Sequence, residues 1–136
     1  MSIKQLIIQF CKNNKTMEQL TKTEEKVMQI LWKLKRAFVK DIIEEISDPK
    51  PPYNTISSVV RILKDKGFVD FKAYGKTYQY FPKVSKLQYK KFTFSQMLRN
   101  YFDGSYQTMV SYMVDEEKIS DSEISEIKKI IEDKAK

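Results

Sequence analysis

The chain has 136 residues, enough for one domain or for one domain with a small appendage. It contains one cysteine and no histidine, which excludes an internal disulfide, a Ser-His-Asp triad and a Cys-His catalytic pair. A zinc or copper site would need carboxylates alone, and we expect no cofactor. Residues 20–91 carry 16 Lys or Arg against 8 Asp or Glu, whereas residues 92–136 carry 6 against 9, within a net charge of +7. This asymmetry favours a polyanion-binding module joined to an acidic region; a lysine-rich surface without a partner is the alternative.

No stretch approaches the roughly 18 apolar residues of a membrane span, and the start of the chain lacks the cleavage site of a signal peptide. We therefore expect a cytoplasmic protein without a membrane partner. Residues 1–19 form a predicted N-terminal extension, in which four apolar residues have amphipathic helix spacing: Ile3, Leu6, Ile7 and Phe10. Two interpretations of residues 1–16 stay open: a loose extension from an upstream start codon, with Met17 as the usual start, or an additional helix that packs on the domain or on a partner.

Two helices are predicted after the extension. Thr21 and Glu24 have the spacing of a capping box, so the first helix should run from about residue 22 to residue 34. Its apolar stripe consists of Val27, Ile30, Leu31 and Leu34. A shorter second helix should end near Ser47, because three prolines follow. It is predicted from Phe38, Ile42, Ile43 and Ile46.

The stretch PPYNTISSVVRILKDKGF, residues 51–68, predicts a third helix with two different faces. Asn54 is a good N-cap, and Gly67 fits the position after the helix, where a left-handed backbone is needed. The buried stripe consists of Ile56, Val59, Val60 and Leu63. The opposite face presents small hydroxyls and cations rather than the usual Glu and Lys: Thr55, Ser57, Ser58, Arg61 and Lys64.

Residues 68–82, FVDFKAYGKTYQYFP, predict a two-stranded hairpin that turns at Gly75 and ends at Pro82. Lys72 and Lys76 should lie near its tip. Three helices followed by a hairpin is the element order of a winged helix-turn-helix, with the third helix as the recognition helix. We therefore expect a mainly α protein with a winged-helix DNA-binding domain at residues 20–83.

The composition of the third helix fits entry into a DNA major groove. Small hydroxyls allow close approach and still form hydrogen bonds, and Arg61 can bind a phosphate or pair with guanine. The start of the helix can face a phosphate, and hairpin lysines can reach neighbouring phosphates. The residues expected to bind double-stranded DNA are Tyr53, Asn54, Thr55, Ser57, Ser58, Arg61, Lys64, Lys72 and Lys76.

Residues 84–136 predict three further helices with many large apolar side chains. Capping boxes precede the first and the last, at Ser85 with Gln88 and at Ser120 with Glu123, and Ile119 and Ile124 have the spacing of a hydrophobic staple. So short a segment can hardly bury these side chains alone, which favours a homodimer with a shared core; folding back onto the winged helix is the alternative. The expected interface residues are Phe94, Leu98, Tyr101, Phe102, Met109, Val110, Met113, Ile124, Ile127 and Ile131.

Four stretches resemble the penicillinase-repressor and methicillin-resistance-repressor family: LTKTEEKVMQILWKL, NTISSVVRILKDKGFV, KAYGKTYQYFP and NYFDGSYQTMVSYM. The resemblance covers roughly residues 20–133. It implies a homodimeric winged-helix repressor that binds a dyad operator and blocks transcription. By the same resemblance, the recognition helix carries Tyr53, Asn54, Thr55, Ser57, Ser58 and Arg61, and the wing carries Lys72, Gly75 and Lys76.

The chain departs from this family at the signal-receiving positions. Members that respond to β-lactams are inactivated by cleavage at an Asn-Phe bond, whose matching positions here are Tyr112 and Met113. Related copper-transport repressors use C-terminal cysteines, which this chain lacks. Both departures argue against those signals and leave open which protease or sensor relieves repression. Two other functions are the alternatives: a winged-helix protein-interaction module without specific DNA binding, and an enzyme, for which no catalytic constellation is present.

Overall fold

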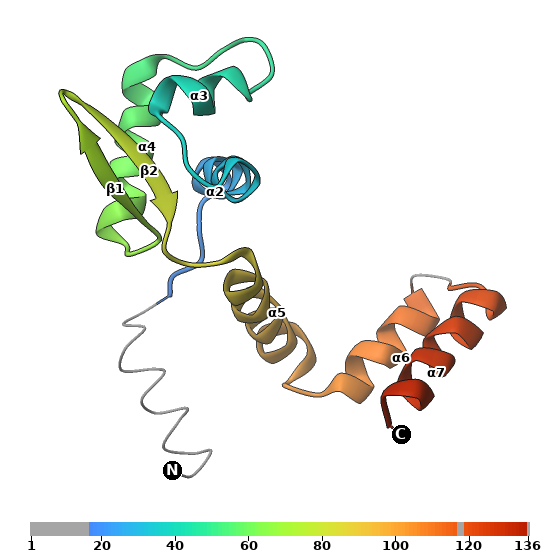
Figure 1. Cartoon of the computed structure of the whole chain (residues 1–136). Coiled ribbons are helices and arrows are strands. Elements are labelled where there is room, and N and C mark those ends of the chain that lie inside the picture. Colours follow the sequence, from blue (N-terminus) through green and yellow to red (C-terminus); the bar gives the residue numbers. More distant parts are fainter. Residues whose placement is uncertain (1–16, 117–118, 136) are drawn as a thin grey trace. The chain divides into compact units, whose positions relative to one another are not determined.

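The computed structural model describes residues 17–116 and 119–135 (Figure 1). Its helices are α2 (Lys22–Leu34), α3 (Val39–Glu44), α4 (Tyr53–Asp65), α5 (Lys86–Phe102), α6 (Tyr106–Glu116) and α7 (Asp121–Ala135). The strands β1 (Val69–Tyr74) and β2 (Thr77–Pro82) form an antiparallel hairpin. The predicted mainly α fold, a winged helix followed by further helices, is confirmed. The helix expected between Ile3 and Phe10 lies outside the described residues.

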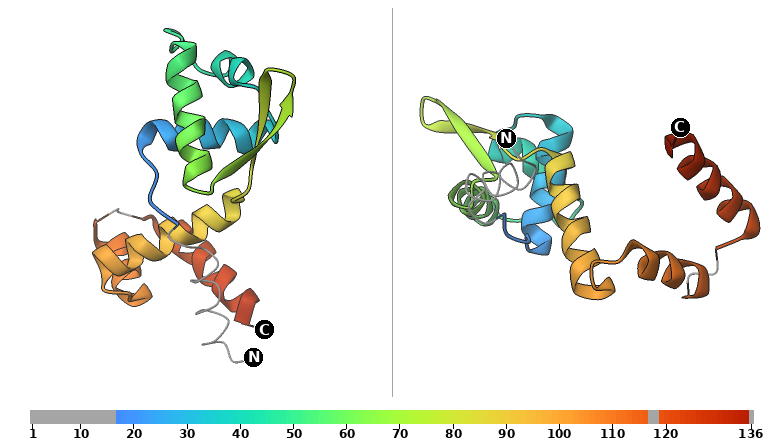
Figure 2. Two further views of the ribbon diagram at one scale, coloured as in Figure 1. Left: turned by 90° about the vertical axis from the view of Figure 1, so that its left-hand side faces the viewer. Right: turned by 90° about the horizontal axis from the view of Figure 1, so that it is seen from below.

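The winged helix is built from α2, α3, α4 and the hairpin. Both α2 and α3 pack on α4 and on β2, and β1 packs on α4. The left view of Figure 2 shows α3 and the hairpin on the same side of α4. Ala37 joins β2 through a bridge in which its N–H donates to the Tyr80 carbonyl at 2.9 Å and its carbonyl accepts from Tyr80 N–H at 2.8 Å. The most deeply buried side chains are Val27, Met28, Leu31, Ile42, Ile56, Val60, Leu63, Phe68 and Val69.

The ends of the first two helices follow from local hydrogen bonds. The predicted capping box of α2 is confirmed, since Thr21 N–H donates to the Glu24 carboxylate at 2.9 Å and Glu24 N–H donates to the Thr21 hydroxyl at 3.2 Å. Before α3, Phe38 N–H donates to the Asp41 carboxylate at 2.9 Å. The regular part of α3 ends at Glu44, three residues before the expected end near Ser47.

The predicted N-cap of α4 is wrong, whereas its predicted end is confirmed. The helix begins at Tyr53 with Pro52 as N-cap, so Asn54 lies inside the first turn. Thr55 N–H donates to the Pro52 carbonyl at 3.1 Å, so the first turn closes on Pro52 and not on Asn54. At the other end Gly67 has φ +84°, and Phe68 N–H donates back to the Leu63 carbonyl at 2.9 Å, as in a Schellman motif.

The hairpin turns at Gly75 and Lys76, between the paired residues Tyr74 and Thr77. Gly75 has φ +64°, which glycine adopts without steric cost. The side chains of a strand alternate between its two faces, so Phe71 and its partner Tyr80 share one face. The neighbouring pair, Lys72 and Gln79, occupies the other face.

The first turns of α5 belong to the winged-helix unit, because the boundary between two compact units falls between Phe92 and Thr93. The predicted capping box of α5 is confirmed by reciprocal bonds between Ser85 and Gln88, at 2.8 and 3.1 Å. Tyr89 is buried, and its ring lies 5.7 Å from the ring of Phe68. Its hydroxyl accepts from Leu20 N–H at 2.9 Å, which ties α5 to the segment before α2.

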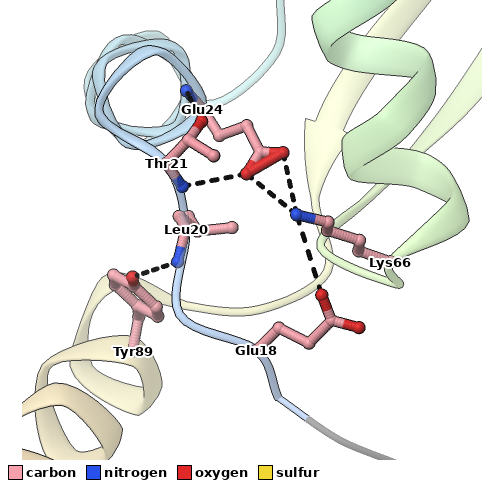
Figure 3. Close-up of polar contacts among 6 residues, drawn as sticks. All are labelled: Glu18, Leu20, Thr21, Glu24, Lys66 and Tyr89. Atoms are coloured by element: carbon pink, nitrogen blue, oxygen red, sulfur yellow. Dashed lines mark hydrogen bonds and ion pairs between the residues drawn. The ribbon is translucent and has the colours of Figure 1, made fainter.

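An ion pair joins the start of α2 to the end of α4 (Figure 3). Glu24 is buried, and both of its carboxylate oxygens accept from Lys66 Nζ at 2.9 Å. Burial raises the pKa of Glu24, but the bonds from Thr21 and Lys66 outweigh it, so the net pKa is lowered. The Glu24 carboxylate in turn raises the pKa of Lys66. Glu18 adds a longer contact of 3.7 Å to the same ammonium group.

The second unit comprises the rest of α5 together with α6 and α7. The ring of Phe94 stacks on Tyr106 at 6.2 Å, and Phe102 packs on Tyr112 at 5.6 Å. The predicted box before α7 forms in a changed way: Ser120 Oγ accepts from Glu123 N–H at 3.2 Å, but the Glu123 carboxylate accepts from the Ser120 hydroxyl rather than from its backbone. None of the helices in the described ranges has the length and apolarity to cross a membrane.

Candidate nucleic-acid interface

The outer face of α4 is polar and open. Tyr53, Asn54, Thr55, Ser58 and Arg61 are all exposed. The helix can hold these side chains outward because its other face is anchored in the core by Ile56, Val60 and Leu63, each at most 2% exposed.

A groove of about 420 Å³ lies between α3, α4 and the hairpin. Three cations line it, and each comes from a different element: Lys40 from α3, Arg61 from α4 and Lys76 from the turn. The rest of its lining consists of Phe38, Val39, Tyr53, Ser57, Thr77, Tyr78 and Tyr80. We call this space the inner groove. Four of the predicted DNA-binding residues therefore meet there, namely Tyr53, Ser57, Arg61 and Lys76.

The cations of the inner groove have no acidic partner in the described part of the chain. The side-chain ion pairs found there join Lys33 to Glu45 and Lys66 to Glu18 and Glu24. None of them involves Lys40, Arg61 or Lys76, and no carboxylate lines the groove among the described residues. Unneutralised cations that converge on one hollow favour an anionic ligand.

The tyrosines of the inner groove supply hydroxyl groups. Burial raises the pKa of Tyr80, and the nearby positive charge of Arg61 opposes that rise without cancelling it. The phenol therefore keeps its proton at neutral pH and can donate a hydrogen bond. With Ser57 and Thr77 in the same lining, the groove combines positive charge with several donors. This combination suits phosphate oxygens, which accept hydrogen bonds and carry negative charge.

The structure separates two of the predicted lysines from the inner groove. Lys64 Nζ lies 5.1 Å from the centroid of the Phe71 ring, a cation–π distance that holds it along the hairpin. Lys72 Nζ lies 5.4 Å from the ring centroid of Tyr74, on the opposite face of the hairpin from Phe71. Gly75 forms the turn and contributes backbone shape rather than a side chain.

Sequence reasoning missed Lys40 together with the aromatic residues Phe38, Tyr78 and Tyr80. Lys40 lies in the first turn of α3, where a cation is unfavourable for the helix dipole. An unfavourable charge of this kind is a signal of function, although a weak one, since Lys22 is placed in the same way in α2. The aromatic residues gave no signal, because alternation in a hairpin does not tell which face meets α4.

The predicted interface residues of the second unit differ in burial. Leu98 is the only buried residue within 93–116 and 119–135. Four others are partly buried, namely Phe102, Met109, Met113 and Ile124. The remaining five are exposed: Phe94, Tyr101, Val110, Ile127 and Ile131. The described residues contain no group of three or more side chains that could hold a metal ion.

The penicillinase repressor family matches residues 20–133 of the chain. The methicillin resistance regulatory protein MecI of Staphylococcus aureus (strain N315) is 33% identical over 123 residues, which cover 90% of this chain and 99% of that protein. MecI of Mammaliicoccus sciuri is 34% identical over 125 residues, with the same coverage. The penicillinase repressor of Bacillus licheniformis is 24% identical over 121 residues, 88% of this chain and 94% of that protein. These matches confirm the resemblance, and the chain belongs to the penicillinase repressor family.

Proposed function

We propose that this protein is a cytoplasmic, sequence-specific DNA-binding transcriptional repressor that acts as a homodimer on a dyad operator. The observation that carries the proposal is the inner groove beside the open face of α4. Lys40, Arg61 and Lys76 line it and form no ion pair with the described residues. The names of the relatives, a resistance regulatory protein and a penicillinase repressor, support the repressor role.

In this proposal α4 enters the major groove and the hairpin tip enters the adjacent minor groove. A phosphodiester strand separates these two grooves of DNA, so it must pass between α4 and the hairpin. The inner groove occupies that position on the protein and has the matching charge. Arg61, Lys40 and Lys76 then bind phosphates, while Asn54, Thr55 and Ser58 face the base edges.

The homodimer is proposed from the second unit. Five of the expected interface residues are exposed, with Tyr101 at 77% and Ile131 at 62%, so this short segment offers much apolar surface to a partner. A symmetric partner would cover them and would place two recognition helices on successive major grooves, about 34–36 Å apart. In this proposal residues 20–83 bind the operator and residues 84–136 contain the dimerisation region.

Binding rather than catalysis is the proposed activity. The inner groove holds cations and hydroxyl groups, and among its described lining residues there is no base that could activate a nucleophile at neutral pH. We assign relief of repression to a protease or a sensor. This assignment does not depend on cleavage between Tyr112 and Met113.

The test is a nuclease footprint and a binding titration with DNA from immediately upstream of the protein's own gene. The wild type should protect a roughly palindromic site. Arg61→Gln should weaken that binding by at least about tenfold and flatten the salt dependence by about one phosphate per half-site. Lys26→Gln removes an equal charge from an exposed position of α2 and should bind as the wild type does. Wild-type binding without preference for any fragment would overturn the proposal and favour a protein-interaction module.

A further inference from the structure

A second basic hollow lies on the hairpin, and no role has yet been assigned to it. Its volume is about 390 Å³. Three cations line it: Lys35 and Arg36 from the turn after α2, and Lys72 from β1. Tyr74, Gln79, Phe81 and Pro82 complete its lining. We call it the outer groove.

The two grooves lie on opposite faces of the same hairpin. Tyr78 and Tyr80 line the inner groove, whereas Gln79 and Phe81 line the outer one. Successive side chains of a strand point to opposite faces, so this alternation separates the two hollows. Phe38 lines the inner groove and Tyr74 the outer one, and their rings pack edge to face at 5.8 Å.

The bridge between Ala37 and Tyr80 brings the turn after α2 to the outer face. Ala37 pairs with Tyr80, so the preceding Arg36 falls on the face of Phe81. Lys72 reaches the same face through its pairing with Gln79. Residues from three neighbouring chain segments thus form one basic surface beside the hairpin.

The cations of the outer groove are not neutralised by the described residues. All three are exposed, and the ion pairs present in the described ranges involve Lys33 and Lys66 instead. Lys35 also has φ +72°, a backbone conformation that glycine adopts more readily than a residue with a side chain. A lysine thus occupies a position whose backbone conformation favours glycine.

We propose that the outer groove binds phosphates of the second DNA strand that borders the minor groove entered by the hairpin tip. This inference rests on the proposed function. A minor groove is about 6 Å wide and is bordered by two phosphodiester strands. One strand passes between the hairpin and α4, in the inner groove. The other strand lies on the far side of the hairpin, where Lys35, Arg36 and Lys72 face it.

The occupant follows from charge and continuity. Lys72 belongs to the hairpin that enters DNA, so a strand at the outer groove continues the interface already proposed and needs no additional partner. Phosphate contacts of this kind position a protein without reading sequence. The contacts should therefore add affinity and length to the bound site but no base preference.

The experiment compares two duplexes that carry the footprinted operator. One extends about one helical turn, ~10 base pairs, beyond each half-site, and the other ends at the base pairs covered by α4. The variant is Lys35→Gln with Arg36→Gln, which removes two positive charges and puts neutral polar side chains in their place. The matched control, Lys22→Gln with Lys26→Gln, removes two exposed charges from α2 that lie outside both grooves and form no ion pair with the described residues.

On the extended duplex the variant should bind about tenfold more weakly than wild type, with a salt slope smaller by about two phosphates per half-site. On the short duplex the variant and the wild type should bind equally, and the control should match wild type on both. Hydroxyl-radical protection of the flanking strand should disappear in the variant.

A different result is that the variant and the wild type bind the extended duplex equally while Arg61→Gln still weakens binding. This result would overturn the proposed role of the outer groove and leave the proposed function standing. A loss of equal size on both duplexes would also overturn the inference, because the contact would not lie on flanking DNA. If the wild type protects no site at all, both proposals fail together.

Discussion

The two compact units of the molecule have helices with the same kind of apolar stripe but differ in how far these stripes are buried. In the winged-helix unit the apolar stripes of α2, α3 and α4 close on one another, and Phe68 and Ile42 are at most 1% exposed. In the second unit the stripes of α5, α6 and α7 leave Tyr101 and Ile131 more than half exposed. Apolar periodicity therefore identifies a face to be covered but not what covers it. The first unit thus covers its own apolar faces, whereas the described residues of the second leave apolar side chains exposed, and the proposed dimer would cover them.

Replacement of Phe68 by alanine should break the winged-helix unit most severely. Phe68 is 1% exposed in the core of the unit, so loss of its ring should lower the free energy of unfolding by about 3–5 kcal/mol. Urea denaturation would measure this loss. Phe81→Ala is the control, because Phe81 is 38% exposed and its removal should cost less than about 1 kcal/mol. Equal urea denaturation midpoints for the two variants would show that burial of Phe68 in the core does not stabilise the unit.

Glu24→Gln tests the ion pair that closes the same unit. The neutral amide leaves Lys66 with only the more distant carboxylate of Glu18, so the free energy of unfolding should fall by about 2 kcal/mol at pH 7. Because folding lowers the pKa of Glu24, the stabilisation is present above the unfolded pKa and is lost as the pH falls through the folded pKa. Wild type should thus lose more stability than the variant between pH 7 and about pH 3. Glu25→Gln removes an exposed carboxylate one residue away and should keep the stability of the wild type. A loss of equal size in Glu25→Gln would mean that removal of any nearby carboxylate, and not loss of the ion pair, lowers the stability.

The second unit is tested by Tyr101→Ser and Ile131→Ser. Each change removes an exposed apolar side chain, so the monomer fold should persist while the dissociation constant of the proposed dimer rises about tenfold, or ~1.4 kcal/mol. Analytical ultracentrifugation over a concentration series would measure it, with the exposed neighbour Asn100→Ser as control. Wild type that sediments as a monomer at micromolar concentration would contradict the proposed dimer.

The smallest expected effect compares one glycine in each unit. Gly75 and Gly104 have φ +64° and φ +75°, and a Cβ at either position would meet no atom within 4 Å. Alanine should therefore cost only backbone strain, about 1 kcal/mol in each case. Urea denaturation should detect the lower stability of the winged-helix unit in Gly75→Ala. Sedimentation should detect weaker association of the second unit in Gly104→Ala. A cost well above this for Gly75→Ala would mean that the turn makes contacts not described.

The sequence predicted elements best where the relevant chemistry is local. The capping box of Thr21 and Glu24 lies within four residues, and the bounds of α2 were correct. Gly67 marked the end of α4 for the same reason. The prediction of Asn54 as N-cap was wrong because Pro52, two residues earlier, is the N-cap of α4.

The candidate site was only partly predictable because it depends on long-range register. Arg61 and Lys76 belong to patterns visible in the chain, whereas Lys40 joins them only through the packing of α3 on α4 and β2. Lys35 and Arg36 reach the hairpin through the bridge of Ala37 with Tyr80, 43 residues apart in number. Nor could the helical pattern of α5 show that Tyr89 is buried beside Phe68.

One feature of the junction gives the protein its own optical reporter. Trp32 is the only tryptophan in the chain, and its indole N–H donates to the Val84 carbonyl at 2.9 Å. Its ring lies 5.9 Å from Tyr89, at the place where α5 meets the winged-helix core. If α5 leaves that core, the indole loses the Tyr89 ring and is more exposed to water, and its fluorescence emission should shift to longer wavelength. Release of α5, the helix that joins the two units, can thus be followed in real time in unlabelled protein.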